Sequence, residues 1–200
     1  MQKYFIAHLV GGRAKTYHEA LTRELTKRFH TVPLHERVEP HVTVKIPFET
    51  DEAGIADVER VLRSFIRNER AVPISFSGFG RFGFRTVYLD IEKNREAVSL
   101  VRRAITVLHE NIPWMPRINH EGNKLHASVA RFLSRRQFRR IWRELAHLHP
   151  RFESALDNVA ILRKEGKTWI VHTLIPIRPQ EDDAVTFPAL DAQETVLQRA

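Results

Sequence analysis

The chain of 200 residues is long enough to bury a sizeable core in one globular unit, or in two lobes that share a core. It contains no cysteine, which excludes a disulfide scaffold, a thiolate nucleophile, a zinc–thiolate site and an iron–sulfur cluster. Its apolar runs are far shorter than the roughly 20 residues that span a bilayer. We therefore expect a soluble, cytoplasmic protein without membrane partners, whose chemistry depends on histidine, carboxylate, hydroxyl, lysine and arginine side chains.

The formal net charge of +8 is unevenly distributed along the chain. Residues 178–200 carry a balance of −3, so that residues 1–177 carry +11. A body this basic is typical of proteins that bind phosphates or nucleic acid, although a solvated basic surface gives the same composition. We expect the acidic tail, residues 178–200, to be partly disordered, with a short helix possible near residues 192–197.

The first half of the chain is predicted to alternate strands and helices. A strand at residues 4–10 is followed by Gly11 and Gly12, which we interpret as a turn because neither phosphate-loop pattern, GxxxxGK or GxGxxG, is present. Apolar residues then recur with helical spacing over residues 17–29. Next come a strand at 42–48, a helix at 55–66, and two strands at 74–76 and 87–91 around the glycine-rich segment 78–83.

The second half repeats this alternation. A helix at 98–108 is followed by an irregular stretch with Pro113 and Pro116, a strand at 125–132 and a helix at 138–148. Two strands at 158–164 and 168–177, joined by a turn, close the pattern. Antiparallel pairs with helices between them indicate an α+β fold rather than a doubly wound parallel sheet.

Two of the predicted strands share an unusual composition, a histidine followed two residues later by a hydroxyl residue. His41 and Thr43 form the first pair, and His126 and Ser128 form the second. Successive side chains of a strand point to opposite faces, so each imidazole shares a face with its hydroxyl while apolar residues occupy the other face. Two such copies, one in each half of the chain, are unlikely to arise by chance.

This chemistry suits displacement at a phosphodiester without a metal. The reaction needs a base for the attacking oxygen, an acid for the leaving oxygen and donors for the non-bridging oxygens. Two histidines with unperturbed pKa values near ~6.5 can divide the first two roles at neutral pH. The alternative is that each histidine lies on a half-exposed sheet face and that the hydroxyl is present for its β-propensity.

The two H-x-(T/S)-hydrophobic tetrapeptides, in a basic chain of this length, resemble those of the 2H phosphoesterase superfamily, which includes the bacterial 2′-5′ RNA ligase-like cyclic phosphodiesterases. The continuation of the first motif into Pro47 and Phe48 strengthens the similarity, which covers most of residues 1–177. The resemblance implies one bilobal α+β domain, with two pseudo-symmetric β/α lobes and antiparallel sheets around a central cleft. It also implies a metal-independent activity, without a cofactor, on 2′,3′-cyclic phosphates of RNA or nucleotides, or on 2′-5′ linkages.

Carried over residue by residue, the resemblance implies that His41 and His126 are the acid/base pair. It implies that Thr43 and Ser128 donate hydrogen bonds to the phosphate. Ser128 in place of threonine lies within the family pattern.

Further residues are candidates for substrate binding. Lys45 follows Thr43 by two residues and should share its face, where it would reach a phosphate or form a salt bridge at the rim. Arg131 begins a run of seven arginines up to residue 151 that is opposed only by Glu144, and this run either tracks RNA or is a solvated helix face. Most aromatic residues near the motifs should be core, but one or two are expected to stack on a base: Phe48, Phe79, Phe82, Phe84, Phe132 and Trp169.

Two other functions compete with the cyclic phosphodiesterase. One is a non-catalytic module that binds RNA ends through the same cleft and the arginine-rich helix. The other is a metal-dependent hydrolase, which is disfavoured because no carboxylate lies near either motif and no histidine spacing matches a known metal motif. We expect no metal and a monomer, and the sequence does not select among RNA ends, cyclic nucleotides and other cyclic phosphates.

Overall fold

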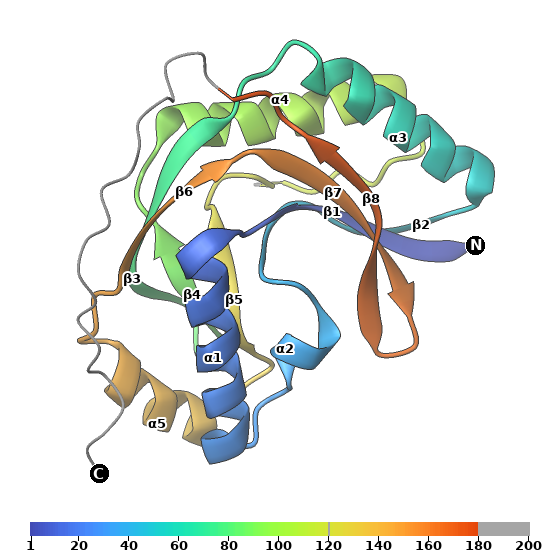
Figure 1. Cartoon of the computed structure of the whole chain (residues 1–200). Coiled ribbons are helices and arrows are strands. Elements are labelled where there is room, and N and C mark those ends of the chain that lie inside the picture. Colours follow the sequence, from blue (N-terminus) through green and yellow to red (C-terminus); the bar gives the residue numbers. More distant parts are fainter. Residues whose placement is uncertain (120, 180–200) are drawn as a thin grey trace.

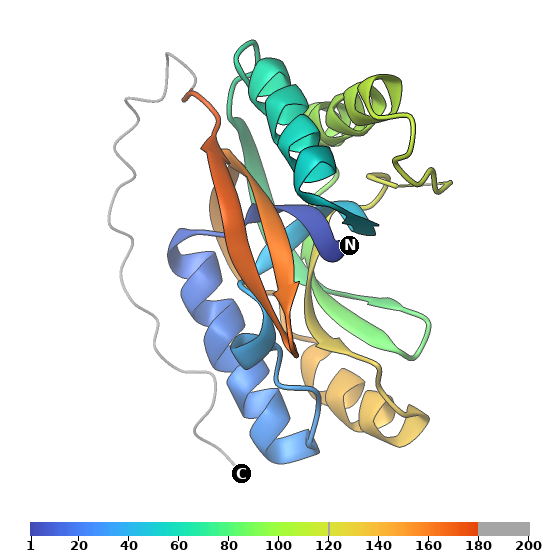
Figure 2. The same ribbon diagram turned by 90° about the vertical axis from the view of Figure 1, so that its right-hand side faces the viewer.

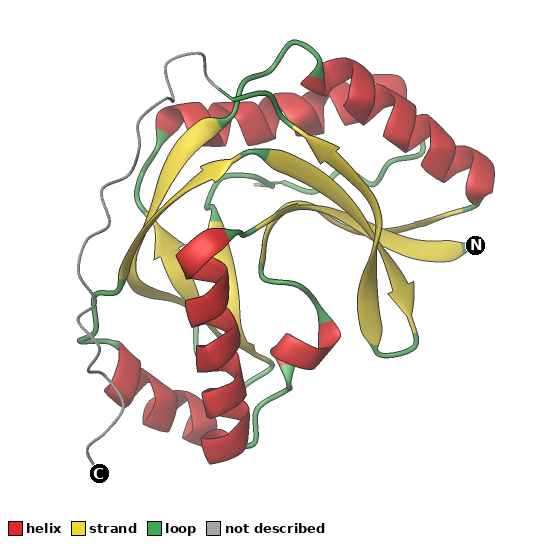
Figure 3. Ribbon diagram, in the orientation of Figure 1, coloured by secondary structure: helices red, strands yellow, loops and turns green. Residues whose placement is uncertain are grey.

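The computed structural model describes residues 1–119 and 121–179, which form five helices and eight strands (Figures 1 and 3). The elements of the first half are β1 (Gln2–Leu9), α1 (Gly12–Phe29), α2 (Leu34–Arg37), β2 (His41–Thr50), α3 (Glu52–Ile66) and β3 (Val72–Phe82). Those of the second half are β4 (Thr86–Ile91), α4 (Arg95–Asn111), β5 (His126–Arg131), α5 (Arg135–Leu145), β6 (Arg151–Leu156), β7 (Asn158–Glu165) and β8 (Thr168–Pro176).

The strands form two antiparallel four-stranded sheets, which confirms the predicted α+β class. One sheet has the order β2-β1-β7-β8, and the other has the order β5-β4-β3-β6. The two halves of the chain therefore exchange strands, because β3 pairs with the second sheet while β7 and β8 return to the first. Both histidine strands, β2 and β5, are edge strands, and they lie against each other where the sheets meet.

The helices cover the sheets in two pairs (Figures 1 and 2). Helices α3 and α4 pack together and contact β2, whereas α1 and α5 pack together and contact β5 and β4 respectively. Each pair buries an apolar helix face in one large core that extends behind both sheets. Side chains cap the helix starts, as Asp51 does for α3, Asn94 for α4 and Ser134 for α5. No described helix is both long and apolar enough to cross a membrane.

The predicted elements are all present in the predicted order, but the structure adds α2 and β6 and lengthens β3. Strand β6 has only one fully buried residue, Leu156, so its apolar alternation is too weak to be detected in the sequence. Strand β3 continues through the glycine-rich segment because Gly78 adopts a φ of +68° where the register with β4 shifts. The acidic segment from residue 180 onward, with the helix suggested near residues 192–197, lies outside the described residues.

Both motif strands contain a β-bulge at the residue after the hydroxyl. In the first sheet Ala7 pairs with Thr43 and Ile6 pairs with Lys45, which leaves Val44 as the extra residue. In the second sheet Val129 is the extra residue in the same way. The burial of the two strands from each histidine onward is consequently identical: half-buried, buried, half-buried, buried, buried. The bulge interrupts simple alternation directly after each motif.

This bulge corrects the expectation that Lys45 shares a face with Thr43. The Lys45 side chain is completely buried, and its ammonium group contacts the Glu121 carboxylate, the Pro116 carbonyl and the His109 ring. An ammonium group has three N–H donors, so these contacts leave none for a phosphate. Lys45 therefore holds the segment that precedes β5 against β2, and we exclude it from the substrate-binding residues.

We predict that Lys45→Met lowers the free energy of unfolding by about 3–5 kcal/mol, because it leaves the Glu121 carboxylate buried and unpaired. Lys45→Met/Glu121→Leu should recover most of this loss. Urea denaturation measures the change. Lys3→Met is the matched control, since the Lys3–Glu49 pair is exposed and worth at most about 1 kcal/mol. Equal unfolding midpoints for Lys45→Met and the parent would contradict the prediction.

Candidate active site

His41 is the first residue of β2, and a nearby backbone carbonyl fixes the orientation of its side chain. Its Nδ1–H donates to the Glu39 carbonyl oxygen at 2.7 Å, which leaves Nε2 as the nitrogen available to a ligand. The ring packs against Phe5 of the neighbouring strand, with 5.1 Å between ring centroids. A backbone carbonyl two residues upstream thus selects the tautomer, and an aromatic ring limits the orientation of the imidazole.

His126 begins β5 and repeats this arrangement. Its Nδ1–H donates to the Lys124 carbonyl oxygen at 2.9 Å, again two residues upstream, so its Nε2 is likewise available. The ring packs against both Phe82 and Tyr88, with centroid separations of 4.8 and 4.9 Å, and those two rings also contact each other. The two histidines therefore share tautomer and orientation although they belong to different sheets.

Burial lowers the pKa of both imidazoles. The pKa of His41 falls to about 4, chiefly through desolvation; the Arg131 charge, and the His18 and His126 rings when they are protonated, lower it further. Desolvation also lowers the pKa of His126, and Arg131 and Lys124 add to the effect. The two imidazoles lie on the adjacent edge strands β2 and β5, so a proton on His126 disfavours a second proton on His41. This differs from the unperturbed values expected from sequence, since both rings are neutral at pH 7 without a ligand.

Thr43 and Ser128 lie on the same faces as their histidines, as alternation predicts, and both are half-buried. Neither hydroxyl hydrogen-bonds to another group in the described part of the chain. Helix α1 holds the backbone of Ser128 in place, because His18 of this helix donates from Nε2–H to the Ser128 carbonyl oxygen at 2.8 Å. Burial lowers the pKa of His18 to about 4, so this ring is a neutral support. We call His41, Thr43, His126 and Ser128 the histidine site.

Arg131 reaches the histidine site because of the bulge at Val129. Strict alternation from His126 would place Arg131 on the opposite face, but the extra residue returns it to the exposed side of β5. Its charge lowers the pKa of both His41 and His126, so the guanidinium lies near both rings. Arg131 is therefore the cation that the structure brings to the site, in the role that the sequence had suggested for Lys45.

Two of the aromatic candidates, Phe48 and Trp169, have different surroundings. Phe48 is buried in the main core, where its ring lies 6.3 Å from Tyr4 and 6.0 Å from Trp114, so we exclude it as a ligand contact. Trp169 is half-buried and meets Phe5 edge-on at 4.7 Å, in a small second cluster next to His41. Trp169 therefore adjoins the histidine site through Phe5.

Sequence reasoning overlooked three residues that hold the site, Phe5, His18 and Tyr88, whereas Phe82, one of the aromatic candidates, contacts the His126 ring. The ring contacts of Phe5, Tyr88 and Phe82 depend on which strands pair, and that of His18 depends on how α1 packs. The hydrophobic pattern of the sequence around each residue predicts neither the strand pairing nor the packing of α1. The upstream carbonyl partners of the two histidines, by contrast, follow from the local backbone.

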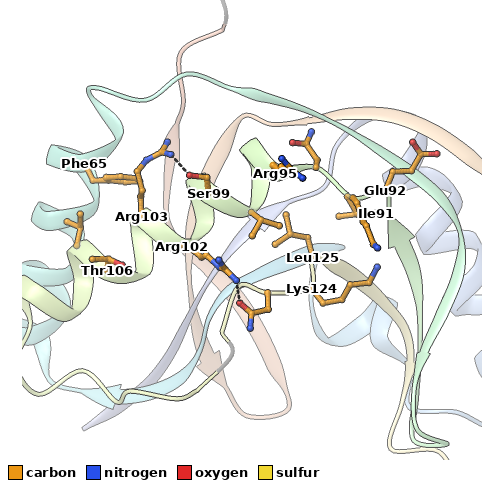
Figure 4. A pocket seen from close by; sticks show the side chains of 15 residues that line it. Phe65, Ile91, Glu92, Arg95, Ser99, Arg102, Arg103, Thr106, Lys124 and Leu125 are labelled. Carbon is orange, nitrogen blue, oxygen red and sulfur yellow. Dashed lines mark hydrogen bonds between the residues drawn. The ribbon is translucent and has the colours of Figure 1, made fainter.

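A pocket of about 700 Å³ lies along α4 and the segment before β5, where its lining ends at Lys124 and Leu125, the two residues before His126 (Figure 4). Arg102 donates to Asn123 at 2.6 Å and Arg103 donates to Ser99 at 2.8 Å on its wall. Neither His41 nor His126 lines it, so its volume does not describe the histidine site. Among the described residues, no group of three or more His, Asp or Glu side chains is arranged to hold a metal ion.

Comparisons with known proteins identify the family to which the chain is similar. The family model described as "2'-5' RNA ligase superfamily" matches residues 14–168. A protein of Geobacillus sp. (strain WCH70) named "Putative phosphoesterase" is 22% identical over 184 residues, which cover 90% of this chain and 99% of the relative. A second relative with this description, from Geobacillus kaustophilus (strain HTA426), is 25% identical over 68% of this chain and 76% of its own.

Solved structures share the fold. TT0787 of Thermus thermophilus superposes with a TM-score of 0.58 at 19% identity, covering 89% of this chain and 99% of that chain. Escherichia coli LigT complexed with 3′-AMP superposes with a TM-score of 0.60 at 11% identity, covering 88% and 98%. The match of the family model over most of the chain, together with the two histidine motifs, shows that this chain belongs to the 2′-5′ RNA ligase superfamily, the 2H phosphoesterases.

Proposed function

We propose that the protein is a metal-independent phosphodiesterase that opens 2′,3′-cyclic phosphates at the ends of RNA or on nucleotides. The observation that carries the proposal is the pair of imidazoles on the adjacent edge strands β2 and β5, each with Nδ1 bound to a carbonyl and Nε2 available. The superfamily, the names of the relatives and the 3′-AMP in the LigT complex support the same chemistry. Since one chain supplies both histidines, we propose that a monomer suffices.

In the proposed reaction His41 is the base. Its low pKa keeps it neutral, so Nε2 accepts a proton from water as the water oxygen forms a bond to phosphorus. His126, protonated, donates the proton on Nε2 to the ribose oxygen whose bond to phosphorus breaks. One phosphomonoester and one free hydroxyl result, and the net transfer of one proton from His126 to His41 is reversed through solvent. With an RNA hydroxyl in place of water, the same steps make a 2′-5′ linkage.

The remaining groups stabilise the charge on the phosphoryl oxygens. The Thr43 and Ser128 hydroxyls donate to the non-bridging oxygens, and the Arg131 guanidinium supplies a positive charge beside them. The substrate anion also acts on His126, because a bound negative charge favours the protonated imidazole and raises its pKa. Trp169, which adjoins His41 through Phe5, is placed to contact the nucleoside.

The arginine-rich helix α5 favours one alternative, a module that binds RNA ends without turnover. Its arginines at 135, 136, 139, 140 and 143 are all exposed. A pure binder has no need for two titratable groups in matched tautomers, so we favour the enzyme. Release of phosphomonoester from a 2′,3′-cyclic nucleotide in the presence of EDTA decides between the two, and binding without release would support the module.

We predict that His41→Ala and His126→Ala each lower kcat/KM for a 2′,3′-cyclic nucleotide by on the order of 10²–10⁴-fold, because each removes a positioned acid or base. Thr43→Ala and Ser128→Ala should cost less, about 10²-fold or below, since each removes one donor. Steady-state release of phosphomonoester measures the rates. His147→Ala, an exposed histidine next to α5, is the control and should retain parent activity.

The double variant His41→Ala/His126→Ala tests whether the two imidazoles act as one unit. Groups that act together are not additive, so the double variant should be no more than about tenfold slower than the slower single variant. A loss equal to the product of the two single losses would assign the histidines independent roles and contradict the proposed pair.

The pH profile of kcat/KM should be a bell displaced to the acid side of neutrality. Activity requires neutral His41, so the rate is lost as pH falls through the His41 pKa of about 4. Activity also requires protonated His126, so the rate declines as pH rises through the lowered His126 pKa. The kcat profile should extend to higher pH because bound substrate raises the His126 pKa. Rates measured from about pH 4 to 9, with and without EDTA, test both statements. A rate that rises steadily with pH, or that is lost in EDTA and restored by a divalent ion, would count against the mechanism.

A further inference from the structure

Exposed aromatic side chains gather beside His126. In the described part of the chain, four large aromatic side chains are exposed by more than about a third: Phe82 at 44%, Phe84 at 36%, Trp114 at 43% and Phe132 at 63%. Three of these, Phe82, Phe84 and Phe132, come from the β3–β4 hairpin and from the residue directly after β5. We call these three residues the aromatic tract. Figure 2 shows the hairpin projecting from the body above α5.

The aromatic tract is continuous with the histidine site. Phe82 meets the His126 ring edge-on at 4.8 Å. Leu133 donates from its backbone N–H to the Arg85 carbonyl oxygen at 3.1 Å, which fixes the hairpin turn that carries Phe84 next to Phe132. Arg131, the cation of the site, immediately precedes Phe132. A polymer whose end occupies the histidine site therefore meets the tract next.

Phe132 stands out because its backbone is in the left-handed region, with φ at +58°. This conformation is rare and unfavourable for a bulky side chain. It turns the ring of Phe132 to solvent while Leu133 enters the core at 1% exposure. An exposed ring held in an unfavourable conformation contributes little to folding, so its role lies in an interaction outside the fold.

Arginines alternate with these rings. The Arg135 guanidinium lies 4.8 Å from the Phe84 ring centroid, and that of Arg131 lies 5.2 Å from the Phe132 ring. Neither residues 79–89 nor residues 126–143 include an acidic residue. Exposed aromatic rings interleaved with arginines, without opposing carboxylates, are the composition of surfaces that stack unpaired bases and neutralise their phosphates.

We propose that the aromatic tract binds the nucleotides adjoining the terminal phosphate of a single-stranded RNA, so that the substrate is an RNA oligonucleotide rather than a mononucleotide. The proposal rests on the proposed function, because it places the RNA end at the histidine site. Bases stack on Phe84 and Phe132, while Arg135 contacts the phosphate between them and Arg131 stays with the terminal phosphate. Phe82 remains in contact with His126 and orients the imidazole.

The experiment compares two substrates, a 2′,3′-cyclic mononucleotide and a five-nucleotide single-stranded RNA that ends in a 2′,3′-cyclic phosphate. The test variant is Phe84→Ser/Phe132→Asn, in which asparagine removes the ring yet tolerates the left-handed backbone. We expect kcat/KM for the RNA to fall about 10- to 100-fold, as loss of stacking predicts, and kcat/KM for the mononucleotide to change less than twofold. Leu174→Ser, an apolar residue on β8 that is 51% exposed, is the control and should change neither rate.

A second measurement keeps this proposal separate from the proposed function. End-labelled five-nucleotide RNA with a 3′-phosphate is titrated with parent and variant, and fluorescence anisotropy gives the Kd. If the parent turns over neither substrate, the proposed function fails, yet a tenfold or greater rise in Kd for the variant still supports the tract as an RNA surface. An unchanged Kd, an equal loss of kcat/KM on both substrates, or equally effective displacement of the RNA by an acidic peptide of the same length overturns the proposal.

Discussion

One extra residue in each motif strand decides which side chains reach the histidine site. The bulges at Val44 and Val129 follow the hydroxyl residue at the same position in both sheets. They bury the next residue of each strand, which is Lys45 in β2 and an alanine in β5. In β5 the same shift returns Arg131 to the exposed side. The bulges thus place Arg131 on the exposed side of β5 and bury Lys45 in the interior.

The exchange of strands between the halves explains why the two motifs meet. Each motif strand is left at the edge of its sheet, and the two edge strands contact each other where the sheets meet. The buried Lys45–Glu121 pair strengthens this junction, because it fastens the segment before β5 onto β2. The distance between the two imidazoles therefore depends on contacts far apart in the chain.

Burial of the imidazoles has a consequence for chemistry. The aromatic rings and carbonyls that orient His41 and His126 also exclude water, and the resulting desolvation lowers both pKa values. The empty site accordingly favours two neutral rings, whereas acid/base catalysis needs one proton on the pair. In the proposed mechanism, a phosphodiester anion beside Arg131 would raise the pKa of His126 and so favour its protonated state.

The sequence by itself determined the order of strands and helices, the α+β class and the faces of His41, Thr43, His126 and Ser128, because side-chain alternation and helical periodicity are local properties of the chain. Only the tertiary structure decided that Lys45 is buried, that Arg131 replaces it and that Phe5, Tyr88 and His18 hold the site. Bulges, strand exchange and helix packing depend on residues distant in sequence. The local periodicity of the sequence therefore does not predict them. Weakly buried β6 was missed for the same reason, since its pairing with β3, rather than its own pattern, makes it a strand.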